Sequence, residues 1–300
     1  MRKKRDYDND GILKQRTKSE RVVFAIVFAL FAFYALSLIF PFLWLIVNSF
    51  KDGAEYAIGV SLRQPFSLPE KWLFSNYTYA ISQMEYNGNT YLHMFFYSVV
   101  FSIIASLEGV FMSALTGYGF SKFQFKGKSV MYAVVIFSMT IPIIGTMGAN
   151  FKLMSDLGIY NTPWYVVVAN LGGFGFNFLV MYGYFKNLSW SYAEAVFVDG
   201  GGHFTAFFRI MLPQAAAPIG TLFIMAMITS WNDYMTYILY MPDYPTIAAG
   251  MYSIEQSLFR TGQVPIYFAA LVLSIIPVLI VFALFSNTIM KNFTMGGLKG

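Results

Sequence analysis

The sequence contains no cysteine, only two histidines and few charged residues. Without cysteine, disulfides and thiolate metal sites are excluded, and His93 and His203 are too few for a histidine-based zinc cluster. Charged residues make up 12% of the 300 residues, about half of the ~25% that is typical of soluble domains. Apolar residues make up 57% instead. This composition indicates an integral membrane protein.

Six apolar stretches are long enough to cross a bilayer, for which about 20 residues suffice. They are residues 22–50, 91–120, 129–147, 162–185, 213–241 and 264–290. The first stretch is not a short apolar run followed by a cleavage site, so we expect a retained span rather than a signal peptide. The sequence therefore predicts an all-α integral membrane protein with six transmembrane helices and both termini on one side.

The basic residues predict the orientation of these spans. If the N-terminus is cytoplasmic, fifteen of the 20 Lys and Arg residues lie inside and only five outside, which follows the positive-inside rule. The outer five are Lys51, Arg63, Lys71, Lys152 and Arg260. This placement explains the basic net charge without nucleic acid as a partner. The N-terminal RKKR is expected either to meet anionic lipid headgroups or to act only on topology.

The same count divides the chain into segments on the two sides of the membrane. We expect a basic cytoplasmic head (1–21), a first transmembrane helix (22–50), an extracytoplasmic loop (51–89), a five-helix core (90–292) and a cytoplasmic tail (293–300). The core contains a cytoplasmic connection at residues 186–212, between the fourth and fifth spans. Localisation is thus predicted to be the cell membrane, as a multi-pass protein.

The cytoplasmic connection contains the stretch AEAVFVDGGGHFTAFFRIMLP, residues 193–213. Ser191-x-x-Glu194 fits a capping box, so a short helix is expected to start near Ser189 and to end at Gly200. A second helix is expected from His203, with Pro213 in the first turn of the fifth span. The segment either rests on lipid or binds a protein. Because its polar side lacks the basic residues of a lipid-lying helix, a protein partner is the better interpretation.

The spacing of this stretch resembles the EAA loop of ABC importer permeases. That pattern is E-A-A, three residues, G, nine residues and I-x-L-P, and here its positions are Glu194, Ala195, Gly200, Ile210, Leu212 and Pro213, with Asp199 before the glycine. The chain departs from the pattern in two places. Val196 replaces the second alanine, and Gly201-Gly202 replace the usual alanine and serine, which is expected to loosen the turn.

Other segments resemble the carbohydrate-type, MetI-like permeases, and the resemblance covers nearly the whole chain. It implies a type I ABC importer permease fold of the maltose type. It also implies a second permease subunit, two cytoplasmic nucleotide-binding ATPase subunits and an extracytoplasmic solute-binding protein. Glu194, Asp199 and Gly200 would then couple the chain to the ATPase. The similar segments are NSFKDGAEY, FSLPEKWLFSNYTYA, TGYGFSKFQFKGK, DLGIYNTPW, SWNDY and FTMGGLKG.

The chain itself is not expected to hold ATP, Mg²⁺ or any other cofactor. Gly127-Lys128-Ser129 would need a glycine at position 122 to complete a phosphate-binding loop, and that residue is Lys122. ATP and magnesium would be bound by the partner ATPase. The chain is therefore predicted not to be an enzyme.

Glu108 lies deep in the second apolar stretch, where a carboxylate is by default a functional candidate. Ser102, Ser106 and Gly109 belong to a stripe of small residues that predicts close helix packing, and Glu108 points away from this stripe. It is expected either to face the solute path or the partner permease, or to be a protonated glutamate bonded to a backbone carbonyl.

Trp231-Asn232-Asp233 is predicted to lie near the outer end of the fifth span, about 30 Å along the helix from Pro213. This group suits a pyranose ring, and it equally suits an interfacial tryptophan with polar neighbours. Asn177 is a further candidate for the solute path, after glycines that permit either bending or close packing. The resemblance to carbohydrate-type permeases implies that the chain is the permease subunit of an ATP-driven sugar or oligosaccharide importer. The alternatives are an ion-coupled secondary transporter using Glu108 and Asp233, or a signalling or structural membrane protein.

Overall fold

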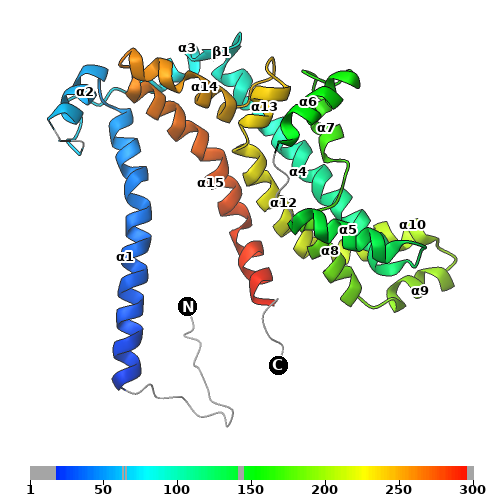
Figure 1. Cartoon of the computed structure of the whole chain (residues 1–300). Helices are drawn as coiled ribbons and strands as arrows, with labels where there is room; N and C mark the ends of the chain where they lie inside the picture. The colour runs from blue at the N-terminus through cyan, green and yellow to red at the C-terminus, as the bar shows by residue number, and fades with distance from the viewer. Residues whose placement is uncertain (1–17, 63, 65, 141–144, 296–300) are drawn as a thin grey trace.

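The computed structural model describes residues 18–62, 64, 66–140 and 145–295, without the side chains of Lys18, Gln256 and residues 285–295. Helices form most of the described chain (Figure 1). They are α1 (Lys18–Ser49), α2 (Gly53–Ser61), α3 (Ser75–Gln83), α4 (Tyr91–Lys122), α5 (Lys128–Thr140), α6 (Thr146–Asp156), α7 (Trp164–Asn170), α8 (Phe176–Asn187), α9 (Ser191–Val198), α10 (His203–Thr205), the π-helix η1 (Ala206–Met211), α11 (Leu212–Gln214), α12 (Ala216–Trp231), α13 (Met235–Tyr240), α14 (Ile247–Arg260) and α15 (Val264–Met295).

The only strands among the described residues form a small antiparallel hairpin of β1 (Glu85–Tyr86) and β2 (Asn89–Thr90). Asn87 and Gly88 join them with φ of 49° and 75°. Asn-Gly with positive φ at both positions is the preferred two-residue hairpin turn. The hairpin leads directly into α4, so it fixes where this long helix begins.

Among the described residues, three continuous helices are long and apolar enough to cross a membrane, within Ser19–Ser49, Tyr91–Lys122 and Val264–Leu284. A fourth crossing exists if His203–Gln214 and Ala216–Trp231, which meet at 73°, are taken as one bent span. The sequence predicts six transmembrane helices, and the fourth and fifth of the predicted stretches are not continuous helices. The third includes α5, residues 141–144 lie outside the described residues, and the fifth is interrupted between α12 and α13.

The predicted fourth span is broken between α7 and α8 by a glycine-rich turn. Gly173 and Gly175 have φ of 59° and 125°, values that only glycine adopts readily. The break presses against α4, because a Cβ added to Gly173 would lie 2.7 Å from the Met112 carbonyl oxygen. The Thr116 hydroxyl donates to the Gly173 carbonyl at 2.7 Å. Both sequence-based interpretations of these glycines, bending and close packing, therefore apply.

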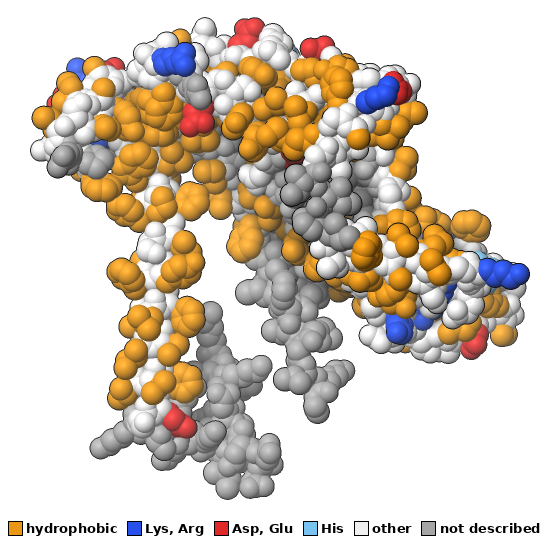
Figure 2. Space-filling model, in the orientation of Figure 1, with side chains coloured by type: hydrophobic (Ala, Val, Ile, Leu, Met, Phe, Trp, Pro, Cys, Tyr) orange, Lys and Arg blue, Asp and Glu red, His pale blue; other side chains and the backbone are white. Residues whose placement is uncertain are grey.

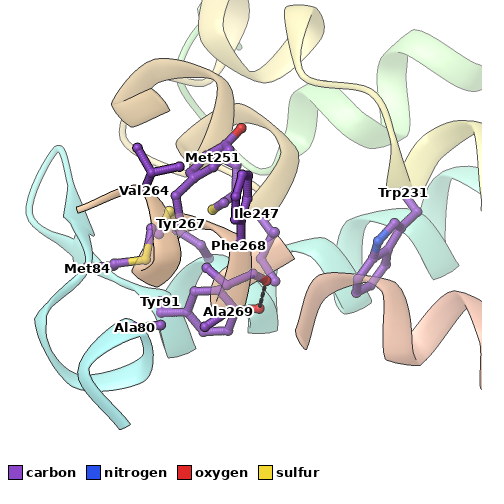
Figure 3. Close-up of a cluster of buried hydrophobic side chains, with 12 residues drawn as sticks. Ala80, Met84, Tyr91, Trp231, Ile247, Met251, Val264, Tyr267, Phe268 and Ala269 are labelled. Carbon is purple, nitrogen blue, oxygen red and sulfur yellow. Dashed lines mark hydrogen bonds between the residues drawn. The ribbon is translucent and has the colours of Figure 1, made fainter. Parts of the chain in front are cut away.

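Hydrophobic side chains from α3, α4, α12, α14 and α15 form a core at one end of the bundle (Figure 3). Tyr91 is 3% exposed and donates a hydrogen bond to the Ala270 carbonyl at 3.2 Å, which joins α4 to α15. Helix α1 reaches this core only near its end, where Trp44 packs edge-on against Phe268. Elsewhere α1 stands apart from the other helices (Figure 1). The side chains of Phe28 and Phe33 in this part of α1 are 75% and 74% exposed, which suits contact with lipid or another chain.

The two ends of the bundle carry most of the charged side chains, and apolar side chains cover the length of α1 between them (Figure 2). The start of α1, the end of α15 and the α9–α10 region lie on the same side of the molecule (Figure 1). The opposite side carries α2, α3, α14 and the hairpin. This arrangement gives the protein two polar faces separated by an apolar band.

Candidate functional site: a helical elbow and a polar cavity

The predicted helix–turn–helix of residues 189–213 forms an elbow at one polar face. Helix α9 ends in a Schellman motif, in which the Gly201 N–H bonds to the Val196 carbonyl at 2.8 Å and the Gly200 N–H to the Phe197 carbonyl at 3.1 Å. Gly200 has φ of 79°, as this motif requires. Residues His203–Gln214 then form the second arm, which meets α12 at 73°. The elbow is thus a turn of defined geometry.

Two local predictions about the elbow are wrong. The capping box at Ser191 is not formed, because α9 begins at Ser191 itself and its N-cap, Trp190, makes no side-chain cap bond. Ser189 instead accepts the Ser191 N–H at 3.3 Å. Pro213 lies in the last turn of the second arm rather than in the first turn of the next span, which starts at Ala216 after the bend. The second arm of the elbow therefore extends two residues beyond Leu212, to Gln214.

The two departures from the EAA pattern are in direct contact. A Cβ added to Gly201 would lie 2.5 Å from Cγ1 of Val196 and 3.0 Å from the Val196 carbonyl oxygen. The valine at position 196 thus occupies the space that an alanine at position 201 would need. The exchange of large and small residues therefore keeps this part of the turn packed.

The predicted coupling residues divide into an exposed group and a packed group. Glu194, Ala195, Asp199, Gly200 and Pro213 are exposed, whereas Ile210 and Leu212 are half-buried. Sequence reasoning missed two apolar residues beside the exposed group, Val198 at 87% and Phe204 at 81% exposure. The elbow thus presents carboxylates and apolar tips together.

A dry core connects the elbow to three of the longer helices. Ala193, Ala206, Phe207 and Met211 of the elbow are buried together with residues of α4, α8 and α12. The Tyr184 hydroxyl of α8 donates to the Gln214 carbonyl at 2.5 Å. The elbow is thus joined to these helices by a continuous packed core, and close-packed interiors of this kind transmit strain.

Aromatic side chains clamp the elbow at its turn. The His203 ring lies 4.9 Å from the Phe197 ring and 5.4 Å from the Phe123 ring, which follows α4. The Lys122 ammonium donates to the Leu188 carbonyl between α8 and α9. His203 is exposed, and its ring contacts connect the two arms of the elbow and the end of α4.

A polar cavity of about 520 Å³ lies between α4, α7, α8, α12 and α13. This volume falls within the range of ligand pockets, about 300–1,000 Å³. The broken fourth span contributes Asn170 from α7 and Asn177 from α8. The interruption after α12 contributes Asp233. Irregular backbone at membrane depth is tolerated where it lines a cavity, so the two helix breaks and the cavity belong together.

The structure brings two of the predicted solute-path residues into this cavity and leaves the others out. Asn177 and Asp233 line it. Trp231 is 5% exposed, and its indole N–H donates to the Ser274 carbonyl of α15 at 3.2 Å, so it does not present a stacking face to the cavity. Asn232 is exposed and bonds back to the Ile228 carbonyl at 2.8 Å. Sequence reasoning missed Tyr165, Asn170 and Tyr237, which also line the cavity.

Glu108 does not line the cavity, although its helix neighbours Ala105 and Gly109 do. Its Oε2 is buried and has no hydrogen-bond partner within the part of the chain that the structure describes. Ile104 and Leu107 beside it are exposed. The predicted bond of Glu108 to a backbone carbonyl is therefore not seen at this oxygen. The structure does not bring Glu108 and Asp233 to one site.

The fold and site are those of a membrane transport subunit, with a cavity between helices and an exposed elbow at one polar face. The description of the family model that matches residues 109–293 is binding-protein-dependent transport system inner membrane component. This match covers more than half of the chain. The protein belongs to this family of multi-pass membrane permeases, which are transport subunits and not enzymes.

Curated relatives and a solved structure agree with this assignment. The chain is 27% identical to the diacetylchitobiose uptake system permease of Streptomyces coelicolor, over 95% of this chain and 92% of that one. It is 28% identical to an arabinooligosaccharide transport system permease of Bacillus subtilis, over 93% and 97%. A chain of a bacterial ABC transporter that imports the acidic polysaccharide alginate has the same fold, with a TM-score of 0.74 at 20% identity over 91% and 99%.

Proposed function

We propose that this protein is one permease subunit of an ATP-driven importer of sugars or oligosaccharides. The observation that carries the proposal is the elbow, because it presents Glu194 and Asp199 on its surface and is packed beneath against α4, α8 and α12. The same helices line the polar cavity. An outside force applied at the elbow thus reaches the solute path. The comparisons give no support to an ion-coupled mechanism.

The elbow is the proposed docking site for a cytoplasmic ATPase. Val198 and Phe204 supply apolar tips that fit a hydrophobic groove, and Glu194 and Asp199 supply charge beside them. Large exposed apolar side chains next to polar ones are typical of protein interfaces. Closure of two ATPase subunits on ATP and Mg²⁺ would then rock the helices around the cavity. No nucleotide is assigned to this chain.

A second permease subunit would complete the solute path. Helix α1 stands apart from the body, with Phe28 and Phe33 about three-quarters exposed at 75% and 74%. The buried Oε2 of Glu108 needs a hydrogen-bond donor that hydrocarbon cannot supply. A polar side chain of a second permease would satisfy it. An extracytoplasmic solute-binding protein would dock on the opposite face, over α14 and the hairpin.

Orientation follows from the positive-inside rule. The face with the elbow carries Lys126, Lys128, Lys186 and Arg209, so it is assigned to the cytoplasm, together with both termini and the basic head of residues 1–21. The head would meet anionic lipid. The sugar assignment rests on the names of the two relatives above and on the hydroxyl and amide groups of the cavity.

Co-purification and ATP hydrolysis test the proposal. The chain is expressed with the permease, ATPase and binding protein encoded beside it, and sugar-stimulated hydrolysis is measured. Glu194→Lys should weaken ATPase binding at least tenfold. Gly200→Pro should do the same, because proline fixes φ near −65° where the turn needs 79°. Both variants should still insert into the membrane.

The matched control is Glu70→Lys, which makes the same charge change at an exposed glutamate on the opposite face. It should leave ATPase binding unchanged. If Glu194→Lys retains ATPase binding and transport at the level of Glu70→Lys, the elbow is not the docking site and the proposal is wrong.

A further inference from the structure

The polar cavity carries a single charge among the described residues that line it, the carboxylate of Asp233, and no Lys, Arg or His. One carboxylate oxygen accepts the Thr236 N–H at 3.1 Å, at the start of α13. This bond fixes the position of the carboxylate. The carboxylate of Asp233 therefore gives the wall of the cavity a negative charge. The first turn of α13 fixes the position of this charge through the Thr236 N–H.

The neutral groups of the cavity are held rigidly around this charge. Tyr237 stacks on Phe101 with ring centroids 5.7 Å apart, and Tyr165 stacks on Tyr240 at 4.9 Å. Both tyrosines are close enough to Asp233 to interact with it electrostatically. Asn177 makes no side-chain hydrogen bond within the described residues and is available to a ligand. Hydroxyl, amide and aromatic groups in this arrangement suit a polyhydroxylated solute.

We propose that Asp233 makes this cavity selective for uncharged or cationic sugars, and that sugars carrying carboxylates are rejected here. The inference rests on the proposed function and specifies its substrate class. A uronate that enters would place like charges together in a site of low dielectric constant, where repulsion is much stronger than in water. A neutral sugar hydroxyl instead donates to the free oxygen of Asp233.

The absence of native cysteine permits a direct test of the field in the cavity. Asn177→Cys and Thr229→Cys each place one thiol at its wall, and Ser82→Cys places one on the outer surface. The assembled importer, built with cysteine-free partners, is treated with methanethiosulfonate reagents that carry either an ammonium or a sulfonate group. Modification of this chain is followed by mass spectrometry. The ratio of the two rates at Ser82→Cys corrects for intrinsic reactivity.

The ammonium reagent should react at least fivefold faster than the sulfonate reagent at both cavity positions, relative to Ser82→Cys. Asp233→Asn, which keeps an oxygen for the Thr236 N–H, should remove most of this preference. Asp156→Asn makes the same charge change at an exposed site and should leave the preference intact. Equal rates in the wild-type background, or a preference that survives Asp233→Asn, would overturn the proposal.

A protection assay extends the test to sugars. Galactotriose or arabinotriose should slow modification of Asn177→Cys by a neutral reagent, whereas trigalacturonate at the same concentration should not. Trigalacturonate should protect in the Asp233→Asn background. Protection by all three sugars, or by none, would overturn the assignment of substrate class. Because ATPase binding at the elbow is measured separately, failure here is distinguishable from failure of the proposed function.

Discussion

The contact between Val196 and Gly201 predicts a specific rescue between two substitutions. Gly201→Ala would place its Cβ 2.5 Å from Val196 Cγ1, an overlap that costs about 1–3 kcal/mol when a packed site must shift. The backbone at 201 is not in the left-handed region, so alanine also reduces the entropy of the unfolded chain, worth about 0.4–1 kcal/mol. The net expectation is a destabilisation of about 1 kcal/mol, within a range of about 0–2.6 kcal/mol for the first cost less the second gain.

Val196→Ala removes the atom that clashes, and the double variant restores the alanine pair of the EAA pattern. We therefore expect Gly201→Ala to be harmful with Val196 and neutral or favourable with Ala at 196. The coupling energy should lie within the range of about 0.5–3 kcal/mol found for residues in contact. The assay is thermal unfolding of the four assemblies in nanodiscs, read together with ATP-driven uptake. Equal effects of Gly201→Ala in both backgrounds would refute the packing argument.

Three other substitutions probe the folding of the spans and the outer face, each by thermal unfolding of the assembly. Gly173→Ala should destabilise the assembly by more than about 2 kcal/mol, because φ at this position is 59° and the added Cβ would lie 2.7 Å from the Met112 carbonyl oxygen of α4. Gly172→Ala is the control: its Cβ would meet nothing within 4 Å, so it should be nearly neutral. Asn76→Ala should cost about 1–3 kcal/mol, because its buried amide donates to the carbonyls of Ser49, the last residue of α1, and Lys51, at 2.8 and 2.9 Å. The exposed Thr78→Ala is the control, and equal losses would contradict the argument. Burial lowers the pKa of Lys51, against a smaller opposing effect of Glu55. Because the unfolded chain therefore binds more protons than the folded chain, the free energy of unfolding should rise with pH below 10.5. Lys51→Met should reduce the slope of this rise.

The elbow and the membrane class were predictable because both depend on local signals. Gly200 before a second helix, and Ile210-x-Leu212 at fixed spacing, specify a turn without knowledge of any distant residue. The positive-inside count likewise requires only the order of the basic residues. The contact between Val196 and Gly201 could not be predicted, because it depends on the distance between the two residues across the turn.

The cavity was only partly predictable because its walls come from five helices. Asn177 and Asp233 attract notice as polar residues in apolar runs. Trp231 attracts notice as an aromatic residue beside two polar ones, yet its indole faces α15. Hydropathy does not indicate which residues near a helix break face the cavity. The break between α7 and α8 depends on the contact of Gly173 with α4. A count of apolar residues along the sequence does not reveal this contact.

Coupling between the elbow and the cavity is the central claim, and the Asn177→Cys thiol measures it directly. Its modification rate by a membrane-impermeant reagent added outside is compared between the resting importer and the importer trapped with ATP, vanadate and the binding protein. The rate should change at least fivefold in an otherwise unaltered chain, and the change should vanish with Glu194→Lys but persist with Glu70→Lys. A full change in the presence of Glu194→Lys, or no change in its absence, would contradict the claim that the elbow drives the solute path.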